Sequence, residues 1–154
     1  MLVDLANTIA EFRKLKIAAD AAIAFVQHGP YSLEELQVVA DDNYEEFSSY
    51  GEFYKDLTFA ERLEKRFGRA GDGQQYHHIV TQGGVNEDKI PPELLQNTDN
   101  VIPLPTLLHE AVNAEYSQLM AGTKMTKYQW LQTQPYDVQR EEGLKILREL
   151  NILK

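Results

Sequence analysis

Apolar side chains recur every three or four positions through the first part of the chain. The members of this row are Leu5, Ile9, Phe12, Leu15, Ala19, Ile23 and Val26. This spacing is typical of an amphipathic helix and predicts one over residues 4–27, with Gly29-Pro30 ending it. His28 lies at the predicted helix end, where we interpret it as a C-terminal cap or a surface residue.

A second helix is predicted to begin at Ser32, because Ser32 and Glu35 have the spacing of a capping box. The acidic and aromatic stretch 41–56 again has helical spacing, which favours core packing, with a partner-binding face as the alternative. Residues 58–67 predict a further helix with Thr58 as its N-cap. Most of the first 70 residues are therefore expected to be helical.

The pattern changes at residues 68–73, where three glycines within six residues indicate a hinge or a closely packed loop. No strand precedes these glycines, which argues against a dinucleotide site. Residues 75–82 contain β-forming side chains and predict a short strand. A loop is expected over 83–89, and a short helix from the proline pair at 91–92 through Leu95.

Residues 101–104 predict a second strand, and Pro103 within it is typical of a sheet edge. A helix is expected from Pro105 or Thr106 through about Leu119, with two more over 126–132 and 135–150. The pattern as a whole predicts an α+β fold that is mostly helical. We place a division between a helical region at 1–57 and a second domain at 58–154.

The composition suits a soluble globular domain, with 154 residues, 43% hydrophobic and 25% charged. The chain has no cysteine, so a metal would have to be held by imidazole, carboxylate or amide groups. The net charge of −9 argues against tight non-specific binding to nucleic acid, which normally uses lysine and arginine. The net charge does not exclude an enzyme that binds a single phosphate through a metal cation and a few nearby basic side chains.

The apolar run 17–26 is interrupted by Asp20 and is too short to span a bilayer. The N-terminus also lacks the order of basic, apolar and small residues that marks a signal peptide. We therefore expect no membrane association. If the protein leaves its cell, its delivery signal is expected elsewhere, for example on a longer parent chain.

Three of the four histidines lie within one window of the sequence. His77 and His78 are adjacent on the predicted strand, and His109 lies on the helix that follows the second strand, with Asn100 before it and Asn113 one helical turn after it. This is the arrangement of a ββα-metal site: two strands joined by a loop and followed by a helix, with histidines on the first strand and on the helix. An imidazole near its pKa can deprotonate water, and a divalent cation can neutralise a leaving oxygen.

Each of these residues also has an ordinary structural interpretation. A lone helical histidine is usually structural, and asparagines such as Asn97 and Asn100 are common in turns. Adjacent residues on a strand point to opposite faces, so His77 and His78 serve one site only if the strand bends there or one of them orients the rest. The sequence pattern alone leaves these alternatives open.

The motif residues resemble a known family. The segments 76–82 (YHHIVTQ) and 95–105 (LQNTDNVIPLP), together with His109 and Tyr116-Ser117, resemble the HNH/endonuclease VII-like nucleases that form the C-terminal toxin domains of bacterial Rhs and related polymorphic toxins. The glycine-rich lead-in at 67–73 and the closing region around 129–148 also resemble this family. The resemblance covers roughly residues 58–152.

The resemblance implies an HNH-like nuclease domain with a ββα-metal core, around which the other helices pack, and it implies a role for each motif residue. His78 would be the general base, and Asn100 would orient it. His77, His109 and Asn113 would hold one divalent cation: Mg²⁺, Mn²⁺ or Zn²⁺. The roles of His77 and His78 could be exchanged.

The implied activity is that of an endonuclease, with DNA favoured over RNA as the substrate. It would act as an antibacterial toxin in the cytoplasm of a target bacterium, delivered as part of a larger toxin and paired with a cognate immunity protein. Candidate substrate contacts are Lys124, Lys127, Arg140, Gln82 and Asn97. A ribonuclease with the same site, or a catalytically weak binding module, remains an alternative.

Two positions depart from the family pattern. Many relatives have Glu where this chain has Thr81, and His where it has Gln96. If the family uses either group to bind metal, this protein would bind metal more weakly or through other ligands. The departures and the negative charge are the observations that favour the binding module.

Overall fold

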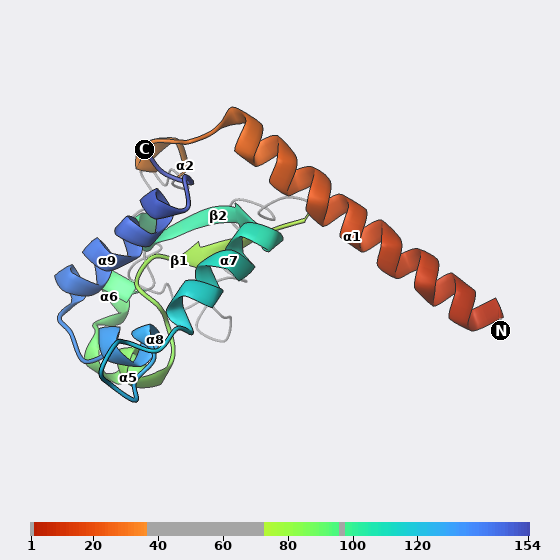
Figure 1. The fold of residues 1–154 in the computed structure, drawn as a ribbon. Helices are drawn as coiled ribbons and strands as arrows, with labels where there is room; N and C mark the ends of the chain where they lie inside the picture. Colours follow the sequence, from red (N-terminus) through yellow and green to blue (C-terminus); the bar gives the residue numbers. More distant parts are fainter. Residues whose placement is uncertain (1, 37–72, 96–97) are drawn as a thin grey trace, which may run out of the picture.

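The computed structural model describes residues 2–36, 73–95 and 98–154, and Figure 1 shows their arrangement. The described chain combines helices with a small two-stranded sheet. The α+β class and its mostly helical character are therefore confirmed. The predicted boundary between residues 57 and 58 lies outside the described residues, as do the stretches 41–56 and 58–67 and the glycines at 68 and 71.

Two strands and one helix form the centre of the described fold. β1 (Gln74–His78) pairs antiparallel with β2 (Val101–Pro105), and α7 (Thr106–Tyr116) follows β2 directly. The other described elements are α1 (Leu2–His28), α2 (Leu33–Leu36), α5 (Gly84–Lys89), α6 (Pro92–Leu95), the 3-10 turn η2 (Thr98–Asn100), α8 (Lys127–Leu131) and α9 (Tyr136–Glu149).

The register of the sheet is regular along the whole of β1, from Gln74 opposite Pro105 to His78 opposite Val101. Among the described strands β2 pairs with β1 alone, so Pro103, which has no N–H to donate, is tolerated there as the sequence predicted. Because side chains alternate along a strand, Gln75 and His77 share one face while Tyr76 and His78 share the other.

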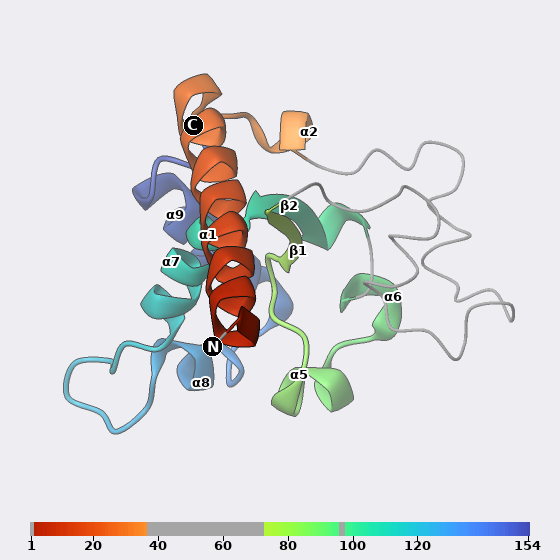
Figure 2. The same cartoon turned by 90° about the vertical axis from the view of Figure 1, so that its right-hand side faces the viewer.

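α7 and α9 lie on the same side of the two strands in both views (Figures 1 and 2). Between these helices and the strands is an apolar core, in which Ile102, Leu104 and Val112 have no exposed surface. Val112 and Tyr116 face inward from α7, at positions one helical turn apart. The core therefore holds α7 firmly against the face of β1 that carries Gln75 and His77.

α1 ends at His28, immediately before Gly29-Pro30, and His28 is exposed, so both predictions for this helix end are confirmed. The second half of α1 contacts α7 and β2, while its N-terminal half extends away from the rest of the protein (Figure 1). The contact is close at Gly73 (φ +69°), where a Cβ atom would lie 2.9 Å from the carbonyl oxygen of Ile17. Glycine is required there by both its backbone angle and the space.

The predicted capping box at the start of α2 is confirmed by its hydrogen bonds, and the structure adds a second one. The hydroxyl of Ser32 accepts from the backbone N–H of Glu35 at 3.3 Å, and the carboxylate of Glu35 accepts in return. Thr126 and Gln129 form a second capping box at the start of α8. In both cases the reciprocal bonds satisfy backbone amides that a helix start leaves without partners.

Two other predictions are wrong. The first strand ends at His78 rather than Gln82, and the expected loop at 83–89 contains the helix α5. Contacts with distant residues stabilise α5: the side chain of Gln132 accepts from the N–H of Val85, and the amide of Asn86 donates to Gln139 at 2.8 Å. Six residues form too short a helix to be stable by propensity, so the local pattern gave no signal for it.

In the part of the chain that the structure describes, no helix is both long and apolar enough to cross a membrane.

Candidate active site

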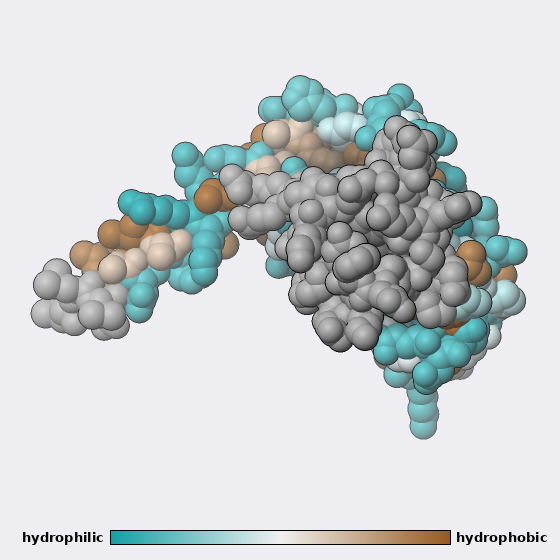
Figure 3. Space-filling model, turned by 180° about the vertical axis from the view of Figure 1, so that it is seen from behind, coloured by the Kyte–Doolittle hydropathy of each residue, from teal (hydrophilic) through white to brown (hydrophobic). Residues whose placement is uncertain are grey.

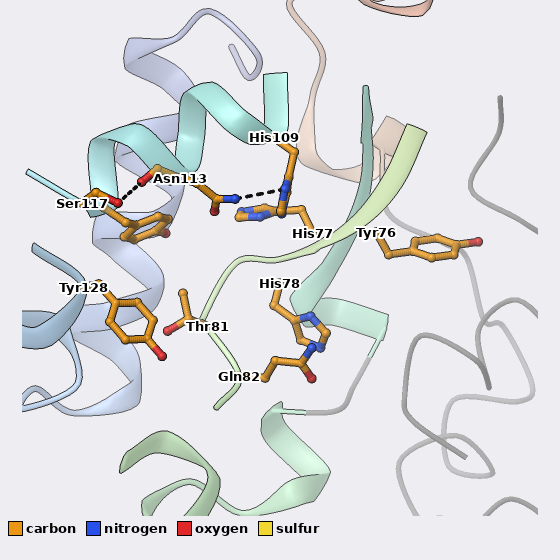
Figure 4. A pocket seen from close by; sticks show the side chains of 10 residues that line it. Tyr76, His77, His78, Thr81, Gln82, His109, Asn113, Ser117 and Tyr128 are labelled. Atoms are coloured by element: carbon orange, nitrogen blue, oxygen red, sulfur yellow. Dashed lines mark hydrogen bonds between the residues drawn. The ribbon is translucent and has the colours of Figure 1, made fainter. Parts of the chain in front are cut away.

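His77 and His109 meet on the α7 side of the sheet. His77 comes from β1 and His109 from the first turns of α7, and their ring centroids lie 5.1 Å apart in an edge-to-face arrangement (Figure 4). β2 runs directly into α7, which places the helical histidine opposite the strand histidine. Two residues that are 32 positions apart in the sequence are thus brought into one cluster.

The imidazole of His77 is buried, with 3% of its surface exposed, and its Nε2 atom has no hydrogen-bond partner among the described residues. The pKa of His77 is lowered to about 3, mainly by burial and also by the neighbouring His109 and His78. The ring is therefore neutral near pH 7. A buried nitrogen without a partner is costly and usually indicates a missing one, such as a water molecule or an ion.

Two carboxamide side chains flank the ring of His109. Nδ1 of His109 lies 2.5 Å from Nε2 of Gln75 and 3.3 Å from Nδ2 of Asn113. Burial also lowers the pKa of His109, partly opposed by the charge of Glu110. The predicted pairing of His109 with Asn113 on one face of α7 is thus observed.

Gln75 is a site residue that sequence reasoning missed. It lies two positions before His77 on the same face of β1, so the strand periodicity of two was a signal that could have found it. Its approach to His109 depends on how α7 packs on the sheet, which the local pattern does not contain.

His78 lies on the other side of the β1 chain from His109 and Asn113, next to Gln82 (Figure 4). The pairing of β1 with β2 is continuous through His77 and His78, so the strand is not distorted there. The two adjacent histidines therefore point to opposite faces. β1 ends at His78, however, and the chain bends at Ile79 and Val80. Both histidines consequently line one pocket, His77 in the cluster and His78 outside it.

This pocket has a volume of about 370 Å³ and opens beside the end of β1. It is lined from β1, from the chain that follows β1, and from α7 and α8. Its lining residues are Tyr76, His77, His78, Thr81, Gln82, His109, Asn113, Tyr116, Ser117 and Tyr128. Thr81, which departs from the family pattern, is therefore part of the pocket.

Asn100 binds the backbone next to His78. It is fully buried; its Oδ1 accepts from the N–H of Val80 at 2.8 Å, and its Nδ2 donates to the carbonyls of Val80 and Leu95. Its own carbonyl accepts from the N–H of Ile79 at 2.8 Å. The side chain of Asn100 thus holds the turn after His78 through hydrogen bonds to the backbone. If Asn100 orients the imidazole of His78, it does so through this backbone.

α9 fixes the same turn from another side. A Cβ atom on Gly143 would lie 2.5 Å from the carbonyl oxygen of Ile79, so the helix approaches the turn as closely as a glycine permits. The hydroxyl of Tyr116 donates to the same oxygen at 3.4 Å, and burial raises the pKa of Tyr116 to about 12. The end of β1 is therefore held by three separate elements.

The cationic side chains predicted to contact substrate are mostly engaged elsewhere. Lys127 forms an ion pair with Glu142 at 3.3 Å, and Arg140 donates to the carbonyl of Asp99 at 3.0 Å. Lys124 is exposed in the turn between α7 and α8, outside the residues that line the pocket. Gln82 does line the pocket, whereas Asn97 lies outside the described residues.

Among the described residues, no group of three His, Cys, Asp or Glu side chains is arranged to hold a metal ion. The cluster has two histidines, and its other polar groups are carboxamides. No protein-family model, no curated protein and no solved structure matches the chain. The family resemblance therefore remains a prediction that the motif residues carry.

The burial of His77 predicts a pH dependence of stability in metal-free buffer. The folded-state pKa of about 3 lies below the unfolded value near 6.5, so the unfolded chain binds the proton more tightly. The stabilisation is complete above pH 6.5 and is lost as the pH falls towards 3. Lowering the pH from 7 to 5 should reduce the free energy of unfolding by about 2 kcal/mol through this group.

Chemical denaturation in a chelating buffer at the two pH values measures this effect. His77→Gln should reduce the difference in unfolding free energy between pH 7 and pH 5 by about 2 kcal/mol. An equal slope in the wild type and His77→Gln would show that His77 does not bind its proton in this way.

Proposed function

We propose that this protein is a metal-dependent endonuclease of the HNH type, with a ββα-metal core formed by β1, β2 and α7. We further propose that it acts on DNA as an antibacterial toxin domain, part of a larger delivered toxin that a cognate immunity protein neutralises. The observation that carries the proposal is the buried Nε2 of His77 beside His109, which has no hydrogen-bond partner in the described part of the chain. The toxin role and the DNA preference rest on the family resemblance.

The residues of the cluster fit a divalent cation. His77 contributes a neutral imidazole nitrogen that no described residue hydrogen-bonds, and Nδ1 of His109 faces two carboxamides. One ring nitrogen has one lone pair, so it accepts well from only one of two amide donors. Each carboxamide also has an oxygen, and two imidazole nitrogens with amide oxygens make a donor set suited to Zn²⁺ or Mn²⁺.

We therefore assign His77, His109 and Asn113 as the residues that would hold the cation. When bound, a divalent cation would neutralise charge on the phosphoryl and leaving oxygens. All three side chains are uncharged near neutral pH, which would leave that positive charge available to the phosphate. This offers a way for a chain of net charge −9 to bind one phosphate.

His78 is positioned for a different task. It lines the same pocket from outside the cluster, on a turn that Asn100 and α9 hold in place. In our proposal, a ring nitrogen of His78 takes the proton of a water molecule whose oxygen forms a bond to phosphorus. The P–O bond to the leaving oxygen breaks, and that oxygen takes a proton from solvent.

Metal-dependent stability tests the site separately from catalysis. A ligand at about 100 times its dissociation constant stabilises the folded state by roughly 2.7 kcal/mol. Thermal or chemical denaturation with Mn²⁺ and Zn²⁺ should show this gain in the wild type. His109→Ala should lose it, and His28→Ala should keep it.

The same samples, incubated with plasmid DNA and with RNA, test the reaction. We expect cleavage of DNA by the wild type in the presence of metal and none by His109→Ala. Cleavage of RNA alone would replace the substrate with RNA. A wild type that neither gains stability with metal nor cleaves either polymer would be the binding module, which the engaged Lys127 and Arg140 favour.

A further inference from the structure

The outer face of α1 carries apolar side chains that nothing in the described structure covers. Leu5, Ile9, Phe12, Ile23 and Val26 are between 44% and 67% exposed, although the spacing of these residues is that of a buried helix face. Figure 3 shows hydrophobic residues along the part of α1 that projects from the protein. Large exposed apolar patches commonly mark interaction sites.

This face is distinct from the one that contacts the rest of the protein. The partly buried residues of α1 are Ala18, Ala19, Ala21, Ala22 and Phe25, so Ala19 lies where the two faces adjoin. At about 100° per residue, the centre of this set lies roughly 120° around the helix from the centre of the exposed apolar row. α1 therefore has one face that contacts its own domain and another that none of the described residues covers.

The exposed row follows a heptad pattern. Its spacing alternates between four and three residues at positions 5, 9, 12, 16, 19, 23 and 26, which correspond to alternating d and a positions. Lys16 occupies one a position and Ala19 the next d position. Large apolar residues at five of these seven a and d positions favour packing against another helix in a two-stranded coiled coil, with Lys16 as the polar exception.

We propose that α1 pairs antiparallel with α1 of a second copy of this chain. In a parallel pair, Lys16 would face Lys16 of the second copy in the same layer, and the two charges would repel. In an antiparallel pair, an a position faces a d position, so Lys16 faces Ala19 and its methylene stem can lie over that small side chain. Ile9 then faces Val26, and Phe12 faces Ile23.

Charge complementarity supports the same orientation. Arg13 and Asp20 are exposed and both occupy e positions beside the apolar row. In an antiparallel pair the e positions of the two helices face each other, which places Arg13 of each copy near Asp20 of the other. In a parallel pair these residues would face g positions, where Thr8 and Leu15 carry no charge.

The area is sufficient for a weak dimer. The exposed row would bury on the order of 600 Å² per copy, or about 1,200 Å² in total, the lower end of specific interfaces. We therefore expect a reversible dimer at micromolar concentration. This inference is independent of the nuclease proposal, because α1 lies outside the pocket residues.

Sedimentation of the full chain over a concentration series tests the dimer. The 17.6 kDa chain should approach twice its mass, and Ile9→Glu with Ile23→Glu should return it to the monomer. Ile17→Glu is a matched control: Ile17 is 47% exposed on the same helix but off the row, so this variant should still dimerise. Circular dichroism confirms that each variant is folded.

Two further experiments test the orientation. Arg13→Glu should weaken the dimer and Arg13→Glu with Asp20→Arg should restore it. Because the chain has no cysteine, Ile9→Cys mixed with Val26→Cys should give a disulfide-linked heterodimer, while Ile9→Cys alone should not cross-link. A wild type that stays monomeric would overturn the proposal, and cross-linking of Ile9→Cys alone would overturn the antiparallel arrangement.

Discussion

His78→Ala should reduce metal-dependent cleavage of plasmid DNA by about 100-fold or more, the usual contribution of a general base. His78 is the imidazole that lines the pocket without belonging to the His77–His109 cluster. Its loss should therefore remove proton transfer while leaving the cation site in place. Initial rates of plasmid nicking at saturating metal measure the effect.

Metal-dependent stabilisation provides the control for this experiment. His78→Ala should keep the stability gain that the wild type shows with metal, whereas His77→Ala should lose it. If His78→Ala lost the gain and His77→Ala kept it, the two roles would be exchanged. Equal cleavage rates for the wild type and His78→Ala would exclude His78 as the base.

Asn100→Ala should lower the free energy of unfolding by about 3–5 kcal/mol. The Asn100 side chain is fully buried and bonds the N–H and carbonyl of Val80 and the carbonyl of Leu95. Alanine would leave these buried groups without their partners, at a cost of roughly 1–3 kcal/mol for each group that water cannot reach. Urea denaturation of metal-free protein measures the change.

Asn113→Ala is the matched control for this substitution. Asn113 is exposed, and its side-chain amide contacts the ring of His109. Removing it should change the stability of the metal-free protein by no more than about 0.5 kcal/mol. A loss below 1 kcal/mol in Asn100→Ala would show that the turn after His78 does not depend on this side chain.

Local hydrogen bonding explains which elements could be predicted from the sequence. The capping boxes at Ser32–Glu35 and Thr126–Gln129 and the end of α1 at Gly29-Pro30 involve residues within a few positions of each other. Their partners are present in the local sequence, so pattern and structure agree. α5 was not predicted, because its stabilising partners, Gln132 and Gln139, lie about fifty residues later.

The candidate site divides in the same way. The strand period correctly predicts that His77 and His78 point to opposite faces, and the helical period correctly pairs His109 with Asn113. The amide of Gln75 was missed because its partner comes from α7. The engagement of Lys127 by Glu142, which weakens its assignment as a substrate contact, likewise depends on how α8 lies beside α9.

The sequence by itself determined the periodic elements: a long first helix with an apolar row, two strands, and the helix that carries His109. These follow from side-chain spacing and short-range hydrogen bonds, which act within a few residues. The tertiary structure decided which faces meet. Packing between β1 and α7 buries the Nε2 of His77 beside His109. No described element packs on the outer face of α1, so that face stays exposed. Both outcomes depend on neighbours that are distant in sequence, which a local pattern does not contain.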